Sequence, residues 1–282
     1  MEIHMRKLKI IADSSADVLS LNDIDFTSVP LKIMTDKREF IDNEDLSVSE
    51  MVDFLDHYKG KSKSSCPNAD EWLSAFGDAD DIICVTITSA LSGSYNAACS
   101  AKQIYEDEHN DRRAFVVDSL SAGPELRLII EKLQEYAKEG VAYDEMCEKI
   151  KAYQQKTGLI FMLKSLKNFA NNGRVSPVLA KLVGLVGICI VGRASDKGEL
   201  DPIDKCRGEI KSLSKVAERL KESGLSKGRV VISHCQNEKG ALSLKASISE
   251  KIPHAKIEIC ECRGLCSFYA EKGGILVGFE KM

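Results

Sequence analysis

The N-terminal half of this 282-residue chain alternates short aliphatic runs with longer segments of helical periodicity, and this alternation is its most constraining feature. Each run is short, aliphatic and followed by a polar cluster, which is typical of a strand. The predicted strands are residues 8–12, 29–33, 82–88 and 115–118, and the predicted helices are residues 47–58, 70–76, 93–105 and 124–140. Strands that alternate with helices favour a mainly parallel sheet flanked by helices, so we predict an α/β domain.

The C-terminal half has a different pattern, with fewer helices between its strands. After a helix at 143–155 we predict strands at 159–163, 185–191, 229–233, 256–261 and 275–279, and helices at 210–223 and 241–252. Ser176-Pro177 combines a serine N-cap with proline at the first helical position, which predicts one more helix. We therefore expect two domains, residues 1–156 and 157–282, the second being α+β with a mixed or antiparallel sheet. The junction between packed domains is a preferred place for a pocket.

The composition argues against several classes of protein. Lysine and arginine total 39 against 43 aspartate and glutamate, and this net charge of −4 argues against nucleic-acid binding, which usually needs a basic face. No apolar run approaches the roughly 18 residues that cross a bilayer, so we do not expect an integral membrane protein. The charged N-terminal segment lacks the apolar core of a signal peptide, which predicts a cytoplasmic protein whose 10 cysteines are reduced thiols.

Several familiar catalytic motifs are missing from the sequence. No two glycines are spaced as Gly-x-Gly, which removes the dinucleotide fingerprint, and no Gly-x-x-x-x-Gly-Lys is present to form a P-loop. Gly-x-Ser-x-Gly, His-Glu-x-x-His and Cys-x-x-Cys are also absent. These absences favour a binding protein over an enzyme, and we expect neither a cofactor nor a metal ion.

Hydroxyl-rich turns follow three of the predicted strands in the first half. They are Asp13-Ser14-Ser15, residues 88–94 and Asp118-Ser119, and a fourth polar loop, Ser64-Ser65-Cys66-Pro67-Asn68, precedes a helix. The carboxyl ends of parallel strands share one edge of the sheet, where ligands bind. Neutral hydroxyls beside a helix N-terminus suit an anion such as a carboxylate. The same residues are also ordinary helix caps and turns, so spacing alone does not establish that these loops converge.

The ordered set of motifs resembles the DegV family of bacterial fatty-acid-binding proteins over almost the whole chain. The matching segments are Asp13-Ser14-Ser15, residues 64–68, residues 89–95, Val117-Asp118-Ser119 with Ala122-Gly123, residues 172–176, and Gly273-Gly274 through Phe279. The resemblance implies a long-chain fatty acid in a tunnel between the two domains, with its carboxylate held by hydroxyls. In that alignment the family threonine falls on Ser64, and the serine of the Leu-Ser-Gly motif falls on Ser92.

The resemblance also implies roles for the neighbouring groups. Ser65 and the backbone N–H of Gly93 would be supporting donors. The N-terminal domain would carry the head-group loops, and the C-terminal domain would close the pocket. Some members of the family deliver a bound fatty acid to a kinase that phosphorylates its carboxylate, so the resemblance points to a lipid carrier with a fatty-acid kinase as partner.

Besides Ser64, where the hydroxyl is kept, three positions depart from the family pattern. Cys66 and Asn68 stand where glutamine and serine are usual, and Cys262 falls where a histidine commonly precedes Gly-Pro-Gly. If Cys262 occupies the histidine position, a titratable hydrogen-bonding group near the pocket is lost. Chain-length preference or partner docking would then differ from that of the relatives.

The residues alone leave alternative roles open. Ser92 could be the nucleophile of an acyl hydrolase with His234 as its base, although no triad acid stands out and a capping role suits His234 as well. Cys260, Cys262 and Cys266 could form a metal or redox module, although a Cys-x-Cys pair on a strand points to opposite faces. Arg174 follows Asn-Gly in a loop and either anchors that loop to an acidic residue or lies on a surface that contacts a kinase.

Overall fold

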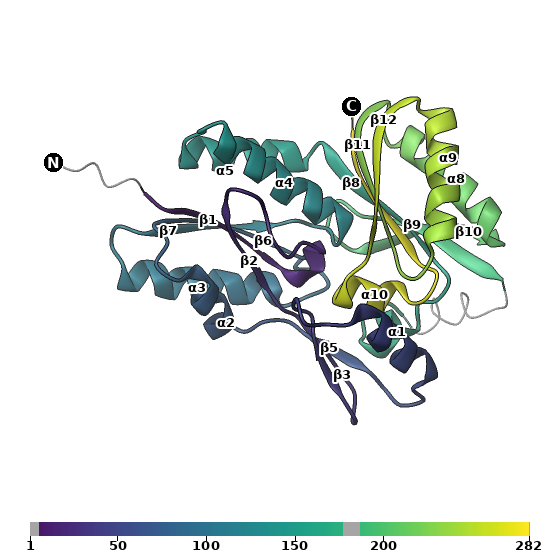
Figure 1. Cartoon of the computed structure of the whole chain (residues 1–282), viewed down its shortest axis with the longest axis horizontal. Helices are drawn as coiled ribbons and strands as arrows, with labels where there is room; N and C mark the ends of the chain where they lie inside the picture. The colour runs from purple at the N-terminus through teal and green to yellow at the C-terminus, as the bar shows by residue number, and fades with distance from the viewer. Residues whose placement is uncertain (1–5, 177–186, 282) are drawn as a thin grey trace.

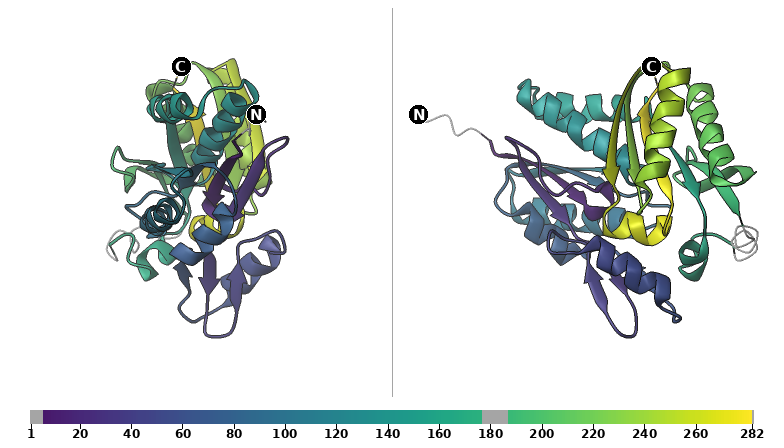
Figure 2. Two further views of the ribbon diagram at one scale, coloured as in Figure 1. Left: turned by 90° about the vertical axis from the view of Figure 1, so that its left-hand side faces the viewer. Right: turned by 45° about the vertical axis from the view of Figure 1, so that its right-hand side comes forward.

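The computed structural model describes residues 6–176 and 187–281, in which three β-sheets carry helices on their faces (Figures 1 and 2). The first sheet is parallel throughout, in the order β2-β1-β6-β7. Its strands are β1 (Leu8–Asp13), β2 (Asp25–Val29), β6 (Asp81–Thr86) and β7 (Arg113–Asp118). Helices α2 (Ala69–Phe76) and α3 (Ser94–Glu108) cover one face, and α4 (Pro124–Lys138) and α5 (Tyr143–Gln154) cover the other. The predicted parallel α/β sheet is confirmed.

The aliphatic content of the central strands accounts for this layering. All residues of β6 are buried, as expected of a parallel strand that has helices on both sides. Trp72 and Phe76 of α2 pack on one face of the sheet, while Leu126 and Ile129 of α4 pack on the other. Pro124 occupies the first turn of α4, where a missing N–H costs nothing.

The second sheet is mixed, in the order β10-β9-β8-β13-β11-β12. Its strands are β8 (Thr157–Leu163), β9 (Ile188–Ala194), β10 (Leu200–Arg207), β11 (Lys227–His234), β12 (His254–Glu261) and β13 (Ile275–Glu280). Strands β11 and β12 pair in parallel, and the other neighbouring strands of this sheet, within the described residues, are antiparallel. Helices α8 (Glu209–Glu222) and α9 (Glu238–Lys251) cover its outer face (Figure 1). The predicted mixed sheet is confirmed, whereas the helix expected at Ser176-Pro177 lies outside the described residues.

A small third sheet corrects two expectations. It has the order β4-β3-β5, with β3 (Lys32–Met34), β4 (Glu39–Ile41) and β5 (Lys63–Ser65). The strand predicted at residues 29–33 is wrong, because Pro30 lacks an N–H and the chain leaves the first sheet there to begin the third. The loop predicted at Ser64-Ser65 is also wrong, since Ser64 pairs with Ile33 in an antiparallel ladder.

The two halves of the chain share packing at their junction. Helix α4 contacts strands of both larger sheets, and one hydrophobic cluster joins Ile33 and Met51 to Phe161 and Phe268. Three short helical elements complete this region: α1 (Val48–His57), α6 (Lys167–Asn171) and α10 (Gly264–Ala270). The division at residues 156/157 stays a prediction, although β8 begins at Thr157.

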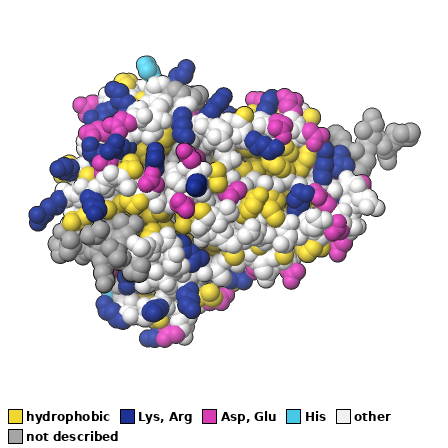
Figure 3. Space-filling view, turned by 180° about the vertical axis from the view of Figure 1, so that it is seen from behind, with side chains coloured by type: hydrophobic (Ala, Val, Ile, Leu, Met, Phe, Trp, Pro, Cys, Tyr) yellow, Lys and Arg dark blue, Asp and Glu magenta, His cyan; other side chains and the backbone are white. Residues whose placement is uncertain are grey.

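Charged side chains of both signs are interspersed over the face in Figure 3, with hydrophobic surface between them. This mixture fits the net charge of −4. In the described part of the chain, every helix is too short or too polar to cross a membrane.

Candidate functional site

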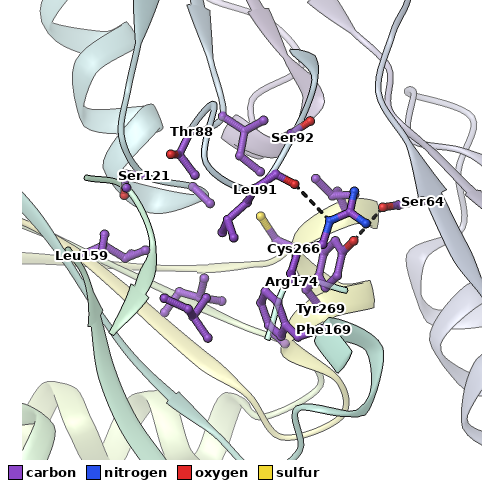
Figure 4. A pocket seen from close by; sticks show the side chains of 18 of the residues that line it. Ser64, Thr88, Leu91, Ser92, Ser121, Leu159, Phe169, Arg174, Cys266 and Tyr269 are labelled. Atoms are coloured by element: carbon purple, nitrogen blue, oxygen red, sulfur yellow. Dashed lines mark hydrogen bonds between the residues drawn. The ribbon is translucent and has the colours of Figure 1, made fainter. Parts of the chain in front are cut away.

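A pocket lies at the junction of the two larger sheets (Figure 4). Its wall is mainly apolar and comes from both halves of the chain, including Leu31, Ile87, Leu159, Phe161, Phe169 and Leu276. Its polar lining includes Ser64, Ser65, Thr88, Ser92, Ser121, Arg174 and Tyr269. In Figure 4, Ser64, Ser92 and Arg174 lie on one side, and Ser121 and Leu159 lie on the other. A mainly apolar cavity with a few polar groups in its wall suits an amphipathic ligand.

The structure brings together the residues singled out in the sequence. Ser64, Ser65, Ser92, Gly93 and Arg174 all line this one pocket. They come from β5, from the turn between β6 and α3, and from the loop after α6. Their roles toward a ligand stay predictions. The loops that carry Ser64 and Ser92 converge on the pocket, whereas Asp13-Ser14-Ser15 and Asp118-Ser119 are not among its described lining residues.

Ser64 is held by two contacts from the second half of the chain. Its backbone N–H donates to Asn172 Oδ1 at 3.1 Å, and its Oγ lies 2.7 Å from the Tyr269 hydroxyl. Pairing with β3 fixes the backbone on the other side. The Ser64 hydroxyl is therefore positioned at the pocket by groups remote in sequence.

Ser92 and Gly93 lie at the start of α3. Ser92 Oγ accepts a hydrogen bond from Ser94 N at 3.3 Å, and Gly93 is the N-cap residue of the helix. Cys66 lies against this turn, since a β-carbon on Gly93 would stand 3.2 Å from Cys66 Sγ. The free N–H groups and dipole of a helix N-terminus favour an anion at this position.

Arg174 joins two loops beside the pocket. Its Nε donates to the Leu91 carbonyl at 3.1 Å, and its Nη1 donates to the Asn172 carbonyl. These contacts are to backbone carbonyls, not to the acidic partner considered from the sequence. They place a guanidinium near Ser64 and Tyr269, as Figure 4 shows.

Asp13, from the first sequence motif, fixes the turn that carries Ser92. Asp13 Oδ2 accepts hydrogen bonds from Ile87 N at 2.9 Å and Ser94 Oγ at 2.7 Å, while Oδ1 accepts from Ser15. Complete burial raises the pKa of Asp13, and these hydrogen bonds oppose that rise. The carboxyl thus ties the end of β1 to both ends of the β6–α3 turn.

Tyr269 is a pocket residue that the sequence reasoning missed. It lies on α10, and its ring packs against Phe169 with centroids 4.6 Å apart. Burial raises the pKa of the Tyr269 hydroxyl, while the Ser64 hydroxyl and the Arg174 charge lower it. A single tyrosine among apolar residues carried no motif signal, because its role depends on a contact with Ser64, 205 positions away.

The alternative roles receive no geometric support. His234 is buried at the end of β11, where its Nδ1 accepts from Asn237 N at 3.3 Å, and it is not among the described residues that line the pocket with Ser92. Burial raises the pKa of the Cys260, Cys262 and Cys266 thiols, which favours the neutral form over the thiolate that binds metal. Within residues 6–176 and 187–281, no cluster of three or more histidine, cysteine or acidic side chains could hold a metal ion.

The fold and the pocket define a class: an α/β protein with two larger sheets, a small third sheet and a mainly apolar pocket at the junction of the larger two. The model of the DegV family, described as "Uncharacterised protein, DegV family", matches residues 7–281. A DegV domain-containing protein of Streptococcus pneumoniae is 42% identical over 276 residues, covering 96% of this chain and 98% of that protein. This chain belongs to the DegV family, which confirms the resemblance seen in the sequence motifs.

Two solved structures are similar in both fold and sequence. One is a DegV family protein from Eubacterium eligens loaded with heptadecanoic acid, with a TM-score of 0.94 and 42% identity. The other is the Streptococcus pneumoniae Fatty Acid Kinase (Fak) B3 protein loaded with linoleic acid, with a TM-score of 0.95 and 42% identity. In each case the match covers 98% of this chain and 100% of the other.

Proposed function

We propose that this protein binds a long-chain fatty acid, with the tail in the apolar pocket and the carboxylate beside Ser64 and Ser92. The observation that carries the proposal is the pocket itself, whose wall is mainly apolar and which has the hydroxyls of Ser64 and Ser92, Arg174 and the N-terminus of α3 on one side. Fatty acids bound in two relatives at 42% identity support the same reading.

Energetics assign different tasks to the two ends of such a ligand. About fifteen buried methylenes at roughly 0.8 kcal/mol each give an upper limit of about 12 kcal/mol. Hydrogen bonds to a charged group contribute about 1.5–3 kcal/mol each, and association costs several kcal/mol. In this proposal the tail determines most of the affinity. Ser64 and Ser92, supported by Ser65 and the Gly93 N–H, determine the orientation and the preference for a carboxylate.

We further propose that the bound carboxylate is presented to a fatty-acid kinase. The turn that carries Ser92 reaches the surface, because Ser89, Ala90 and Gly93 are exposed. A partner could therefore approach the head group while the tail stays covered. The name of the Fak B3 relative associates that protein with a fatty acid kinase, which supports the proposal. In this scheme the chain is a carrier, it needs no cofactor of its own, and the kinase supplies the phosphoryl chemistry.

A cytoplasmic location suits this role. All ten cysteines are free thiols, which is the usual state in a reducing compartment. Binding of nucleic acid has no place in the proposal, since the pocket is apolar.

Lipid analysis of the purified protein tests the proposal most directly. We expect solvent extraction and mass spectrometry to release one long-chain fatty acid per chain. Ser92→Ala should weaken fatty-acid binding about tenfold to a hundredfold, because it removes one hydrogen bond to the carboxylate. Ser89→Ala is the matched control: Ser89 is an exposed serine in the same turn and is not among the described pocket residues. Absence of lipid together with no measurable binding of added fatty acid would refute the proposal, and equal affinity of both variants would refute the role of Ser92.

A further inference from the structure

Cys189 and Cys206 face each other across two neighbouring strands of the mixed sheet. In the antiparallel ladder of β9 and β10, Cys206 is the register partner of Cys189. Residues directly opposite in such a ladder have Cα atoms about 4.5–5.5 Å apart, which lies within the range that a disulfide spans. Within residues 6–176 and 187–281, no other strand pairing sets two cysteines opposite each other.

The two cysteine side chains also lie on the same face of the sheet. Both are buried in the hydrophobic cluster beneath α8 with Leu213 and Val216, whereas Ile190, the residue after Cys189, belongs to the cluster on the other face. Opposite side chains on one face of an antiparallel pair are direct neighbours. A disulfide between these thiols therefore needs side-chain rotation but no change of strand register.

The position of β10 gives an oxidant a route to this pair. Among the described strands, β10 is an edge strand that pairs only with β9, and its register shifts between Pro202 and Asp204. Segments with few paired neighbours open locally more readily than core strands. Burial, with Asp204, raises the pKa of the Cys206 thiol, while two lysines of α8 oppose the rise. Cys206 is thus not a strongly activated thiolate, and its proximity to Cys189 is what favours a bond between the two sulfurs.

We propose that Cys189 and Cys206 form a reversible disulfide, which fastens the edge strand β10 to β9, when the protein meets a low-molecular-weight disulfide such as oxidised glutathione. One cysteine thiolate attacks the oxidant, which forms a mixed disulfide and releases one molecule of reduced thiol. The second cysteine thiolate then attacks the protein sulfur of the mixed disulfide and releases a second reduced thiol. The two cysteines together lose two protons and two electrons, and both electrons reduce the oxidant.

The cross-link would act on a segment that borders the pocket. The hairpin between β9 and β10 carries Gly198 and Leu200, which line the pocket, and a β-carbon on Gly198 would lie 2.0 Å from Thr88 Oγ1 in the first half of the chain. A disulfide between residues 189 and 206 closes a loop that contains this hairpin, so it would restrict the separation of its strands. The inference does not depend on the proposed function, because it concerns the hairpin with or without a bound lipid.

A redox titration with peptide mapping tests the disulfide. The purified full-length protein is equilibrated in glutathione buffers with a rising ratio of oxidised to reduced form, quenched in acid, alkylated and digested for mass spectrometry. We expect a linked peptide pair that contains Cys189 and Cys206, is lighter by two hydrogen atoms than the reduced peptides together, and disappears with dithiothreitol. The melting temperature should be about 5 °C higher for the oxidised protein than for the reduced protein, because the cross-link constrains the unfolded chain.

Cys189→Ala and Cys206→Ala each remove one partner, on different strands, so neither variant should form the linked peptide or show this temperature difference. Comparing the two redox states of the same variant cancels any loss of stability that the substitution itself causes. Cys147→Ala is the matched control, because Cys147 is also buried but lies on α5, and it should behave like the wild type. The proposal would be overturned if Cys189 and Cys206 of the wild type stayed open to alkylation in excess oxidised glutathione. A temperature rise that persists in both partner variants would equally contradict it.

Discussion

The carboxyl of Asp17 has a buried oxygen and lies near a second carboxyl, that of Asp42, and replacing Asp17 with asparagine should stabilise the protein at high pH. Asp17 Oδ1 accepts from Arg263 N at 2.9 Å, while Oδ2 is buried without a partner among the described residues. Burial of the carboxyl, reinforced by the Asp42 carboxyl, raises the pKa of Asp17 to about 8, although Arg263 and Cys266 oppose the rise. The native state therefore keeps this proton well above the pH at which the unfolded chain loses it.

The magnitude follows from proton linkage. An unfolded aspartate titrates near pH 3.9, so the native pKa is higher by about 4 units, and each unit corresponds to about 1.4 kcal/mol. Between about pH 4 and 8 the native state binds more protons than the unfolded state, so the free energy of unfolding falls as pH rises. This group costs up to about 5 kcal/mol above about pH 8 and nothing below about pH 4. An asparagine at this position would be neutral at every pH and would avoid that loss.

The substitution suits the local backbone and hydrogen bonding. Asp17 has φ of 58° and ψ of 26°, a left-handed conformation that asparagine also adopts readily. The amide oxygen retains the acceptor for Arg263 N. At about 2 °C per kcal/mol, Asp17→Asn should raise the melting temperature by up to about 10 °C at pH 9 and leave it nearly unchanged at pH 4.5. The assay is thermal unfolding from pH 4.5 to 9 in a reducing buffer, with Asp56→Asn as an exposed control. A difference between variant and wild type that does not grow with pH would refute the reasoning.

Three further predictions concern the pocket and its supports. Tyr269→Phe removes the hydroxyl that contacts Ser64 but keeps the ring, so fatty-acid affinity should fall about fivefold with little loss of stability, as a displacement titration would detect. Gly198→Ala should lower both melting temperature and affinity, because the residue has φ of +75° and the new β-carbon would lie 2.0 Å from Thr88 Oγ1; unchanged values would contradict that contact. Asn68→Ala removes a helix capping box and should cost about 1 kcal/mol in urea unfolding while leaving ligand affinity unchanged.

The elements that could be predicted from the sequence are those with a strong periodic signal. Strand β6 and helix α4 carry long aliphatic patterns and begin close to their predicted positions. Strand β10 was missed because it is an edge strand with the polar sequence Leu-Asp-Pro-Ile-Asp-Lys-Cys-Arg and a register shift after Pro202. Helix α10 was missed because it has only seven residues and begins at a glycine. Tertiary contacts, not local preference, specify both elements.

From the sequence, the residues of the site could be predicted as separate polar loops, but not their arrangement in one pocket. Ser64 and Ser92 can be recognised in the sequence as hydroxyls in turn-like segments. Their convergence depends on β5 pairing with β3 in the third sheet and on α10 packing against that sheet. Asp13 shows the limit of the same reasoning, since its motif is real but its carboxyl binds the Ile87 N–H and the Ser94 hydroxyl, not the pocket space. A polar motif at a strand end can therefore contribute to a site indirectly, by stabilising a neighbouring loop that carries the site residues.

Cys262 stands where relatives commonly have a histidine, and its effect can be judged from the protonation of Cys262 and Tyr269. Cys262 is buried, its N–H donates to the His234 carbonyl, and it is not among the described residues that line the pocket. Burial raises the pKa of its thiol well above the ordinary value, and burial also raises the pKa of the Tyr269 hydroxyl. Both groups therefore stay neutral at physiological pH, whereas a histidine would titrate near about pH 6.5. Within the described pocket lining, the Tyr269 hydroxyl on α10 contacts Ser64, so this polar contact uses a group that does not change charge near neutrality.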